Sequence, residues 1–367
     1  MTDHLPVRRQ RAGRAHLTVA VSLAAAHLAF VPASAHAADP AGCTRDGTHI
    51  TCTNGVPKGQ TVTGTSGDDT IEVTGTVHGT IDGGDGNDTI TVHGRNGAPG
   101  SNTSGRRADA DNGGDGENAV GSGGTVLGGA GNDIITLIGG NGGKGGTSFA
   151  RFGKGGYGGL GGDSVEAGVV DGGRGINLIT LRGGAGGIGG AASNGKPGDG
   201  ATGGRGLDAG RVIVGADQHS SLTIDGGTGG DAAPGGRDSG DGGVAVWRGV
   251  MEGGTAPEGV SIDITGGDSG RGSGEGWGGV GFFIGELMGT PGGDDITLEG
   301  GKSRSSRAKG RAFVSGPLDT KGGDDTITVR GGVTASTQCG PGNDTYNYTE
   351  QRGIPNRRTC EHINRFR

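Results

Sequence analysis

The chain has 367 residues, of which 93 are glycine and only 3% are aromatic, and its formal net charge at pH 7 is −7. So little apolar volume excludes a single thick globular core and favours a thin core that repeats along the chain. The acidic balance disfavours nucleic acid as a partner and suits cations. The same composition is typical of disordered chains, but regular strand-like segments argue against disorder of the whole chain.

Residues 1–37 have the pattern of a secretory signal peptide. Arginines dominate the start, an apolar run extends from Leu17 to Val31, and the small residues Ala35-His36-Ala37 follow. We therefore predict export, cleavage near Ala37 and a secreted, extracellular mature protein. The pair Arg8-Arg9 leaves both the general and the twin-arginine export route open. No second apolar span follows, so we expect no membrane span.

All four cysteines lie in the part predicted to be exported. Their positions pair Cys43 with Cys52 and Cys339 with Cys360, and each pair closes a short loop. Of the possible connectivities, these local pairs would cap the two ends of a stacked array. We expect an N-terminal disulfide cap over residues 38–60 and a C-terminal cap over 349–367. A zinc site is disfavoured because the cysteines lack the tight paired spacing that zinc needs.

Two near-identical stretches are the most informative feature of the chain: GGDGNDTITV from Gly83 and GGAGNDIITL from Gly128. Both fit Gly-Gly-x-Gly-x-Asp-x-U-x, where U is a large apolar residue, a pattern typical of a calcium-binding turn that leads into a β-strand. The glycines permit positive φ, the aspartate offers a hard oxygen ligand, and the apolar residue enters a core. We predict that residues 61–348 form the calcium-binding repeats of an all-β, parallel β-roll or β-helix solenoid.

Echoes of the strand recur along the chain. Alternating apolar and polar residues, rich in β-branched types and bounded by glycines, predict a short half-buried strand in each repeat. Parallel coils would bury one face of each strand. Aligned on that strand, the equivalent apolar positions are Ile71, Ile90, Ile135, Ile179, Leu222, Ile262, Ile296, Ile327 and Tyr346.

The middle repeats are longer because glycine-rich runs follow the strand, such as GGNGGKGGTS from Gly139 and GGAGGIGGAAS from Gly183. A period of three fits extended polyproline-II-like segments packed side by side, and it fits flexible loops equally well. A second recurrence precedes another strand. Its sixth-position residues Asn118, Asp163 and Asp208 predict stacked turns on the other edge of the coil.

The predicted calcium ligands are Asp69, Asp88, Asp133, Asp163, Asp294, Asp325 and Asp344. In stacked coils, equivalent turns lie roughly 4.8 Å apart, close enough for carboxylates and carbonyls of neighbouring turns to share an ion. Asn177, Ser220 and Val260 take the aspartate position in the middle repeats, so we expect two calcium-rich ends and a calcium-poor middle. The alternative is that the aspartates only serve their own turns through local hydrogen bonds.

The nonapeptides GGDGNDTIT, GGAGNDIIT and GGLGGDSVE resemble the hemolysin-type, or RTX, calcium-binding repeats. This resemblance implies a parallel β-roll with calcium between successive turns, and folding that calcium triggers outside the cell. We expect a right-handed coil from the resemblance and from the general preference of parallel crossovers. Because inserts separate the nonapeptides, a wider β-helix is the alternative to a roll.

We predict a structural or adhesive role rather than an enzymatic one. The sequence has no Gly-x-Ser-x-Gly nucleophile elbow, and the histidines after residue 37 are never spaced four residues apart for zinc. One alternative is a polysaccharide lyase or hydrolase in which Arg182, Arg248 or Arg330 serves as the base. Another is a surface protein that binds the cell wall or extracellular polysaccharide through aromatic residues, for which core or cap positions are the competing interpretation. These aromatics are Phe149, Phe152, Tyr157, Trp247, Trp277, Phe282 and Phe283.

Overall fold

The computed structural model describes residues 39–215, 219–304, 310–333, 337–351 and 359–366. The predicted signal peptide lies outside these residues. Throughout the described ranges the regular elements are β-strands, which confirms the all-β class. In the same ranges, no helix has the length and the apolar character that crossing a membrane requires.

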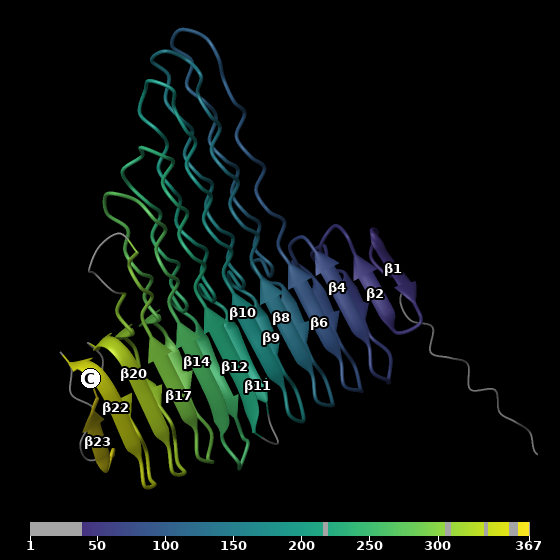
Figure 1. The fold of residues 1–367 in the computed structure, drawn as a ribbon. Helices are drawn as coiled ribbons and strands as arrows, with labels where there is room; N and C mark the ends of the chain where they lie inside the picture. Colours follow the sequence, from purple (N-terminus) through teal and green to yellow (C-terminus); the bar gives the residue numbers. More distant parts are fainter. Residues whose placement is uncertain (1–38, 216–218, 305–309, 334–336, 352–358, 367) are drawn as a thin grey trace, which may run out of the picture. The chain divides into compact units, whose positions relative to one another are not determined.

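The strands form two sheets, and from β3 to β14 the chain alternates between them (Figure 1). Sheet A contains β1 (Cys43–Asp46), β2 (His49–Cys52), β4 (Thr70–Thr74), β6 (Thr89–His93), β8 (Ile134–Ile138), β10 (Leu178–Arg182), β12 (Ser220–Asp225), β14 (Val260–Thr265), β15 (Phe282–Ile284), β17 (Asp295–Glu299), β18 (Phe313–Ser315), β20 (Thr326–Val333), β22 (Thr345–Gln351) and β23 (His362–Arg365). Sheet B contains β3 (Thr61–Thr63), β5 (Thr80–Asp82), β7 (Thr125–Leu127), β9 (Val169–Asp171), β11 (Arg211–Gly215), β13 (Val250–Gly254), β16 (Glu286–Met288), β19 (Leu318–Asp319) and β21 (Thr337–Gln338). Neighbouring strands pair in parallel, except that β1 runs antiparallel to β2.

One coil consists of a sheet B strand, a glycine–aspartate turn, a sheet A strand and the segment that leads to the next sheet B strand. The register of sheet A places Ile90 beside Ile135 and Ile135 beside Ile179. The column continues in the predicted order at both ends, from Ile71 to Tyr346. The alignment of the repeated strand is therefore confirmed, and this stack of parallel strands is compatible with the predicted solenoid.

The core is thin because each strand buries only alternate residues. In β6, Ile90 and Val92 are fully buried while Thr91 between them is partly exposed. Ile81 of β5 is the corresponding buried residue in sheet B, and the buried side chains of both sheets form one cluster. Burial of one such side chain contributes about 1.5–3 kcal/mol. A single coil holds few of them, so its stability depends on the coils stacked against it.

The glycine-rich inserts are hydrogen-bonded side by side, as the extended alternative predicts. Between β6 and β13, each insert runs outward from the end of a sheet A strand and returns toward sheet B (Figure 1). The Gly142 amide donates to the Ala185 carbonyl of the next coil (2.8 Å). The following amide, that of Gly143, donates to the Gly114 carbonyl of a returning segment (2.7 Å). The inserts are thus built from two hydrogen-bonded layers rather than from flexible loops.

In many triplets the amide of the third residue donates to a side chain of the preceding coil. The Asn141 amide donates to Asn96 Oδ1 in the preceding coil (2.8 Å), and Asn141 Oδ1 accepts the Ala185 amide of the following coil (2.8 Å). All three amides of the triplet are thereby paired, so the inserts form without an apolar core of their own. The same contact recurs with the acceptors Asn102, Asp109, Asn112, Asp115, Asn118, Asp163, Asp231, Asp241 and Asp268.

The predicted equivalence of Asp163 and Asp208 is wrong. Asp163 Oδ1 accepts the amide of Arg205, and Val165 pairs with Leu207, so Arg205 stands in the position equivalent to Asp163. The two residues are 42 apart, whereas Asp163 follows its partner in the preceding coil by 45. The coil is shorter here, and a fixed period of 45 residues therefore misplaces Asp208.

Both predicted disulfides are present. Cys43 and Cys52 lie opposite each other in the β1–β2 hairpin and are bonded. Cys339, which follows β21, is bonded to Cys360, which precedes β23. Each bridge therefore fastens the last elements of the stack to their neighbours, one at each end.

Candidate functional site

The glycine–aspartate turns connect sheet B to sheet A and direct their aspartates inward. In the turn between β5 and β6, Gly84 and Gly86 have φ angles of +100° and +116°, a region that residues with a Cβ rarely adopt. Asp88 follows them and is only 1% exposed. Two of the motif's glycines thus serve the backbone, and the turn that they make brings a carboxylate into the protein interior.

The aspartates of successive coils form a hydrogen-bonded ladder. The amide of Asp69 donates to Asp88 Oδ1 (2.8 Å), and the amide of Asp88 donates to Asp133 Oδ1 (2.8 Å). These bonds link neighbouring coils. At the C-terminal end the same contact joins Asp294 to Asp325 (2.8 Å), Asp325 to Asp344 (2.9 Å) and Asp344 to Glu361 (3.0 Å). Asp69 and Asp294 also accept hydrogen bonds within their own turns, from Thr65 and Thr290, as the alternative from the sequence predicts.

Most ladder aspartates keep one carboxylate oxygen without a partner. Oδ2 of Asp88 and Oδ2 of Asp133 are buried and accept no hydrogen bond, and the same is true of Asp69 Oδ1, Asp325 Oδ2 and Asp344 Oδ2. An unsatisfied buried polar atom costs about 1–3 kcal/mol. Asp294 differs, because its two oxygens accept the Val260 amide and the amide and hydroxyl of Thr290.

Asn177 indicates what the unpaired oxygen faces. It stands in the ladder position after Asp133: its Oδ1 accepts the Asp133 amide (3.0 Å), and its Nδ2 donates to the Gly173 carbonyl (3.4 Å). An aspartate in this position presents an oxygen where Asn177 presents an NH2 group. Two oxygens form no hydrogen bond unless a proton lies between them, and a cation is the other way to bring them together.

The first glycine of the motif lies directly against the carboxylate. A Cβ added to Gly83 would lie 2.5 Å from Asp88 Oδ2 and 2.3 Å from the Gly128 carbonyl oxygen. The corresponding atom on Gly128 would lie 2.6 Å from Asp133 Oδ2 and 2.5 Å from the Gly172 carbonyl oxygen. These positions therefore exclude any side chain, and they concentrate carboxylate and carbonyl oxygens around one point of each turn.

Burial makes Asp88, Asp325 and three other ladder aspartates weaker acids. Desolvation raises the pKa of Asp88 to about 6 and the pKa of Asp325 to about 7. Hydrogen bonds oppose this rise in pKa: the Asp69 amide donates to Asp88, and the Asp294 amide and the Thr320 side chain donate to Asp325. Neighbouring aspartates raise the pKa of both groups further. Desolvation is also the main cause that raises the pKa of Asp133, Asp294 and Asp344. The folded chain thus holds carboxylates whose charged form is less favourable than it would be in water.

The oxygen atoms of the turns match the preference of a hard cation. Calcium takes carboxylate and backbone carbonyl oxygens as ligands, and both kinds meet beside Gly83 and Gly128. The described residues contain no group of three or more acidic, histidine or cysteine side chains suited to a metal. A calcium ion at these turns would therefore depend on backbone carbonyls together with one or two aspartates.

The predicted ligands fall into two groups and one outlier. Asp69, Asp88 and Asp133 occupy successive coils at the N-terminal end, and Asp294, Asp325 and Asp344 do so at the C-terminal end. Asp163 lies on a returning insert segment, outside the ladder, and its carboxylate lies 3.8 Å from the Arg205 guanidinium. Glu361 was missed because no glycine motif precedes it.

Comparisons with protein-family models, with curated proteins and with solved structures gave no match.

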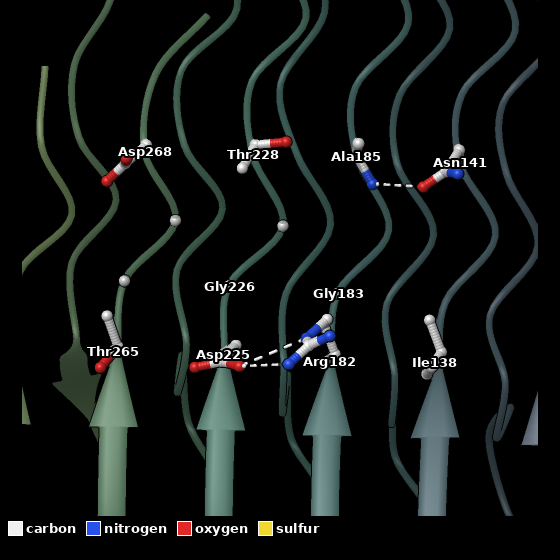
Figure 2. Close-up of a pocket in the computed structure, with 13 residues that line it drawn as sticks. Ile138, Asn141, Arg182, Gly183, Ala185, Asp225, Gly226, Thr228, Thr265 and Asp268 are labelled. Carbon is white, nitrogen blue, oxygen red and sulfur yellow. Dashed lines mark hydrogen bonds and ion pairs between the residues drawn. The ribbon is translucent and has the colours of Figure 1, made fainter. Parts of the chain in front are cut away.

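A groove lies at the base of the inserts, where the strands of sheet A end (Figure 2). It has a volume of about 420 Å³ and is lined by glycine backbone, by polar side chains and by Ile138 and Ala185. Arg182 and Asp225 form an ion pair of 3.1 Å at the ends of β10 and β12, while Asn141, Thr228 and Asp268 stand in a row above them. A neighbouring groove of about 540 Å³ shares Ile138 and Asn141 and extends past β6 to Thr74 at the end of β4. Together the two grooves cross several coils.

The arginines proposed as bases in the lyase alternative include two with acidic partners, since Arg182 pairs with Asp225 and Arg330 lies 3.7 Å from Glu299. The aromatic residues divide into two classes. Phe282 is buried, and Trp247 stacks on Phe283 with ring centroids 4.3 Å apart, as expected for core or cap positions. The surface class is between 48% and 60% exposed and comprises Phe149, Phe152, Tyr157 and Trp277.

Proposed function

We propose that this protein is an exported calcium-binding β-solenoid with a structural or adhesive role. The observation that carries the proposal is the buried, unpaired carboxylate oxygen that recurs from coil to coil in the ladder. A column of such oxygens destabilises the fold at neutral pH, and a divalent cation between turns would offset that cost. The resemblance of the turns to RTX repeats supports the same conclusion.

At the N-terminal end, Asp88 and Asp133 would hold calcium together with the carbonyl oxygens of Gly128 and Gly172. When bound, the ion supplies positive charge that compensates the carboxylates and joins adjacent coils. Because these oxygens converge only in the folded chain, binding would add directly to the folding free energy. The chain would thus gain its full stability only in a calcium-rich medium outside the cell.

A proton is the competing solution for the same oxygen. With pKa values of about 6 for Asp88 and about 7 for Asp325, protonated carboxyl groups would form as the pH falls. A protonated carboxyl donates a hydrogen bond and so removes the unpaired atom. Calcium binding depends on the identity of the cation and protonation depends on pH alone, so an experiment can distinguish them.

The test is thermal unfolding of the purified protein at pH 8 in calcium, in magnesium and in chelator, followed by circular dichroism. We expect the highest melting temperature in calcium, because a ligand of the folded state alone adds about 2.7 kcal/mol at a hundredfold excess over its Kd. Magnesium is the matched control, since its small octahedral shell suits carbonyl-rich turns poorly. Equal melting temperatures in the three buffers would leave only a ladder stabilised by protons.

The adhesive part of the proposal draws support from the groove in Figure 2. Polar side chains line the groove in several coils, interrupted by Ala185, and a polysaccharide with many hydroxyl groups is a matching partner. We expect the protein to be retained by insoluble cell-wall polysaccharide, and the Thr228→Tyr variant, which fills the groove without removing a ladder residue, to be released. If the polysaccharide does not retain the unmodified protein, the adhesive hypothesis is wrong, and the calcium hypothesis is unaffected.

A further inference from the structure

The tips of the first two inserts form one hydrogen-bonded unit, made of residues 101–109 and 147–154 and called the insert tip below. Thr103 pairs with Ser148, and the amides of Phe149 and Arg151 donate to the carbonyls of Thr103 (2.8 Å) and Gly105 (3.3 Å). The hydroxyl of Ser148 also donates to the Ala108 carbonyl (2.8 Å). The insert tip lies at the end of the inserts remote from the two sheets (Figure 1).

Two phenylalanines are exposed at this insert tip. Phe149 is 60% exposed and Phe152 is 55% exposed, although aromatic residues make up only 3% of the chain. Other phenylalanines are used inside the protein, where Phe282 packs edge-on against Phe313. Exposure of two large apolar side chains within four residues has an energetic cost, so it calls for an apolar partner.

The charge of the insert tip opposes that of the chain. Arg106, Arg107 and Arg151 are all exposed, and Arg151 also lies over the ring of Phe152 at 5.5 Å. Within the described residues, none of the three guanidinium groups forms an ion pair. Asp109 is the acidic residue in the insert tip, whereas the whole chain has a net charge of −7. A basic, aromatic point on an acidic protein complements an anionic partner.

We propose that the insert tip docks on the surface of an anionic phospholipid membrane. Phe149 and Phe152 would enter the interface between headgroups and acyl chains, and the three arginines would contact lipid phosphates. Arginine binds phosphate through two parallel hydrogen bonds, and aromatic side chains are favoured at the membrane interface. This inference does not depend on calcium in the turns, which lie at the other end of the coils.

A membrane suits this geometry better than a soluble polyanion. An extended polymer is usually held in a groove, where it contacts side chains repeated from coil to coil, and the insert tip is a projecting end with its charges on two neighbouring inserts. Apolar side chains at a projecting end gain most by entering a layer. Each arginine near an anionic surface would contribute roughly fivefold in affinity.

The experiment is cosedimentation of the purified protein with vesicles of phosphatidylcholine alone and of phosphatidylcholine with about 30 mol% phosphatidylglycerol, at about 0.1 M salt. Both are measured in calcium and in chelator, with circular dichroism as the check of folding. We expect binding to the anionic vesicles at least about tenfold stronger than to the neutral ones, and weaker binding at higher salt. Equal binding to both vesicles, or to neither, would overturn the proposal.

Variants separate the apolar contribution of the phenylalanines to vesicle binding from the electrostatic contribution of the arginines. The double variant Phe149→Ser/Phe152→Ser and the double variant Arg106→Gln/Arg107→Gln should each lose about tenfold or more in binding. Trp277→Ser is the matched control, because Trp277 is 52% exposed but lies on a returning segment outside the insert tip, and it should bind like the unmodified protein. Normal vesicle binding by the folded phenylalanine variant would contradict the membrane proposal. So would competition by soluble dextran sulfate that is equally strong for the unmodified protein and for the phenylalanine variant, because the partner would then be a polyanion.

Discussion

At the scale of single residues, one atom decides the chemistry of each turn. Asp133 and Asn177 follow one another in the ladder, yet Asn177 donates to a carbonyl with the atom that Asp133 leaves as an unpaired oxygen. The amide completes the hydrogen bonds of the turn without any ion or proton. The carboxylate needs an ion or a proton to pair its free oxygen. The stability of the coil should therefore depend on the calcium concentration and on the pH.

The substitution Asp88→Asn tests this difference. In chelator at pH 8 we expect the variant to be about 1–3 kcal/mol more stable than the parent, because the new amide would donate to the Gly84 carbonyl as Asn177 does to that of Gly173. In calcium the advantage should disappear. The measurement is urea unfolding in both buffers.

The reverse substitution, Asn177→Asp, is the matched control for that experiment. It places a new unpaired carboxylate between Asp133 and Ser220, so it should lower stability in chelator at pH 8 by a similar amount and increase the response to calcium. A loss of stability in chelator for Asp88→Asn would contradict the role assigned to the unpaired oxygen.

Residue types in the strands were predictable, and their neighbours in the turns were only partly so. Alternation of Ile90, Thr91 and Val92 is a local signal of a half-buried strand, and the structure confirms it. The side-chain ladder is not a local signal, because the partner of Asp88 lies 19 or 45 residues away. Asp163 shows the limit: it has the motif of a calcium turn, yet it lies on an insert segment outside the ladder, where its Oδ1 accepts the Arg205 amide.

At the scale of elements, the inserts replace an apolar core with backbone hydrogen bonds. The three amides of a triplet such as Asn141-Gly142-Gly143 have different acceptors. The amides of the two glycines donate to carbonyls of the next coil and of the opposite layer, and the amide of Asn141 donates to a side-chain oxygen. The period of three was visible in the sequence but was equally typical of flexible linkers. The deciding signal was asparagine or aspartate at the third position in successive inserts, as at Asn96 and Asn141.

The substitution Gly143→Ala should disrupt the insert locally. The added Cβ would lie 2.0 Å from the Ala98 carbonyl oxygen, which is backbone and cannot move aside cheaply. We expect a loss of about 1–3 kcal/mol and faster hydrogen exchange in neighbouring inserts. Lys144→Ala, at the exposed position beside it, is the control and should change stability by less than about 0.5 kcal/mol. Equal effects of the two substitutions would argue against close packing.

At the scale of the whole molecule, the raised pKa values predict an unusual pH dependence. The pKa of Asp88 is about 6 and that of Asp325 about 7 in the folded chain, against an ordinary value of 3.8. Between pH 3.8 and these raised pKa values, the folded chain therefore binds more protons than the unfolded chain. The free energy of unfolding decreases as the pH rises through this range. In chelator we expect lower stability at pH 8 than at pH 5.

Calcium should flatten that dependence, because it compensates the ionised carboxylates directly. The measurement is the melting temperature across pH 5–8 with calcium and with chelator. A melting temperature that rises from pH 5 to pH 8 in chelator would show that other groups dominate and that the ladder carboxylates are not strained as anions.

Each coil contacts mainly its neighbours, so damage at one end should remain there. In Cys339→Ser/Cys360→Ser, loss of the bridge should destabilise the C-terminal coils by about 3 kcal/mol. We expect faster hydrogen exchange in β22 and β23 and little change in β6 to β10. Uniform loss of protection along the chain would indicate one cooperative unit instead.

The reversed direction of β1 changes the edge that sheet A offers to a second copy of the chain. The last strand of a parallel stack offers a row of amides and carbonyls on which a further copy can grow. β1 runs antiparallel to β2 and is bonded to it through Cys43 and Cys52, so a copy added in the same orientation would have to pair antiparallel at this edge. In a reducing cytoplasm the bridge is absent and the hairpin opens more easily. Export, which we propose above, would let this bridge form only after the chain has left the reducing cytoplasm.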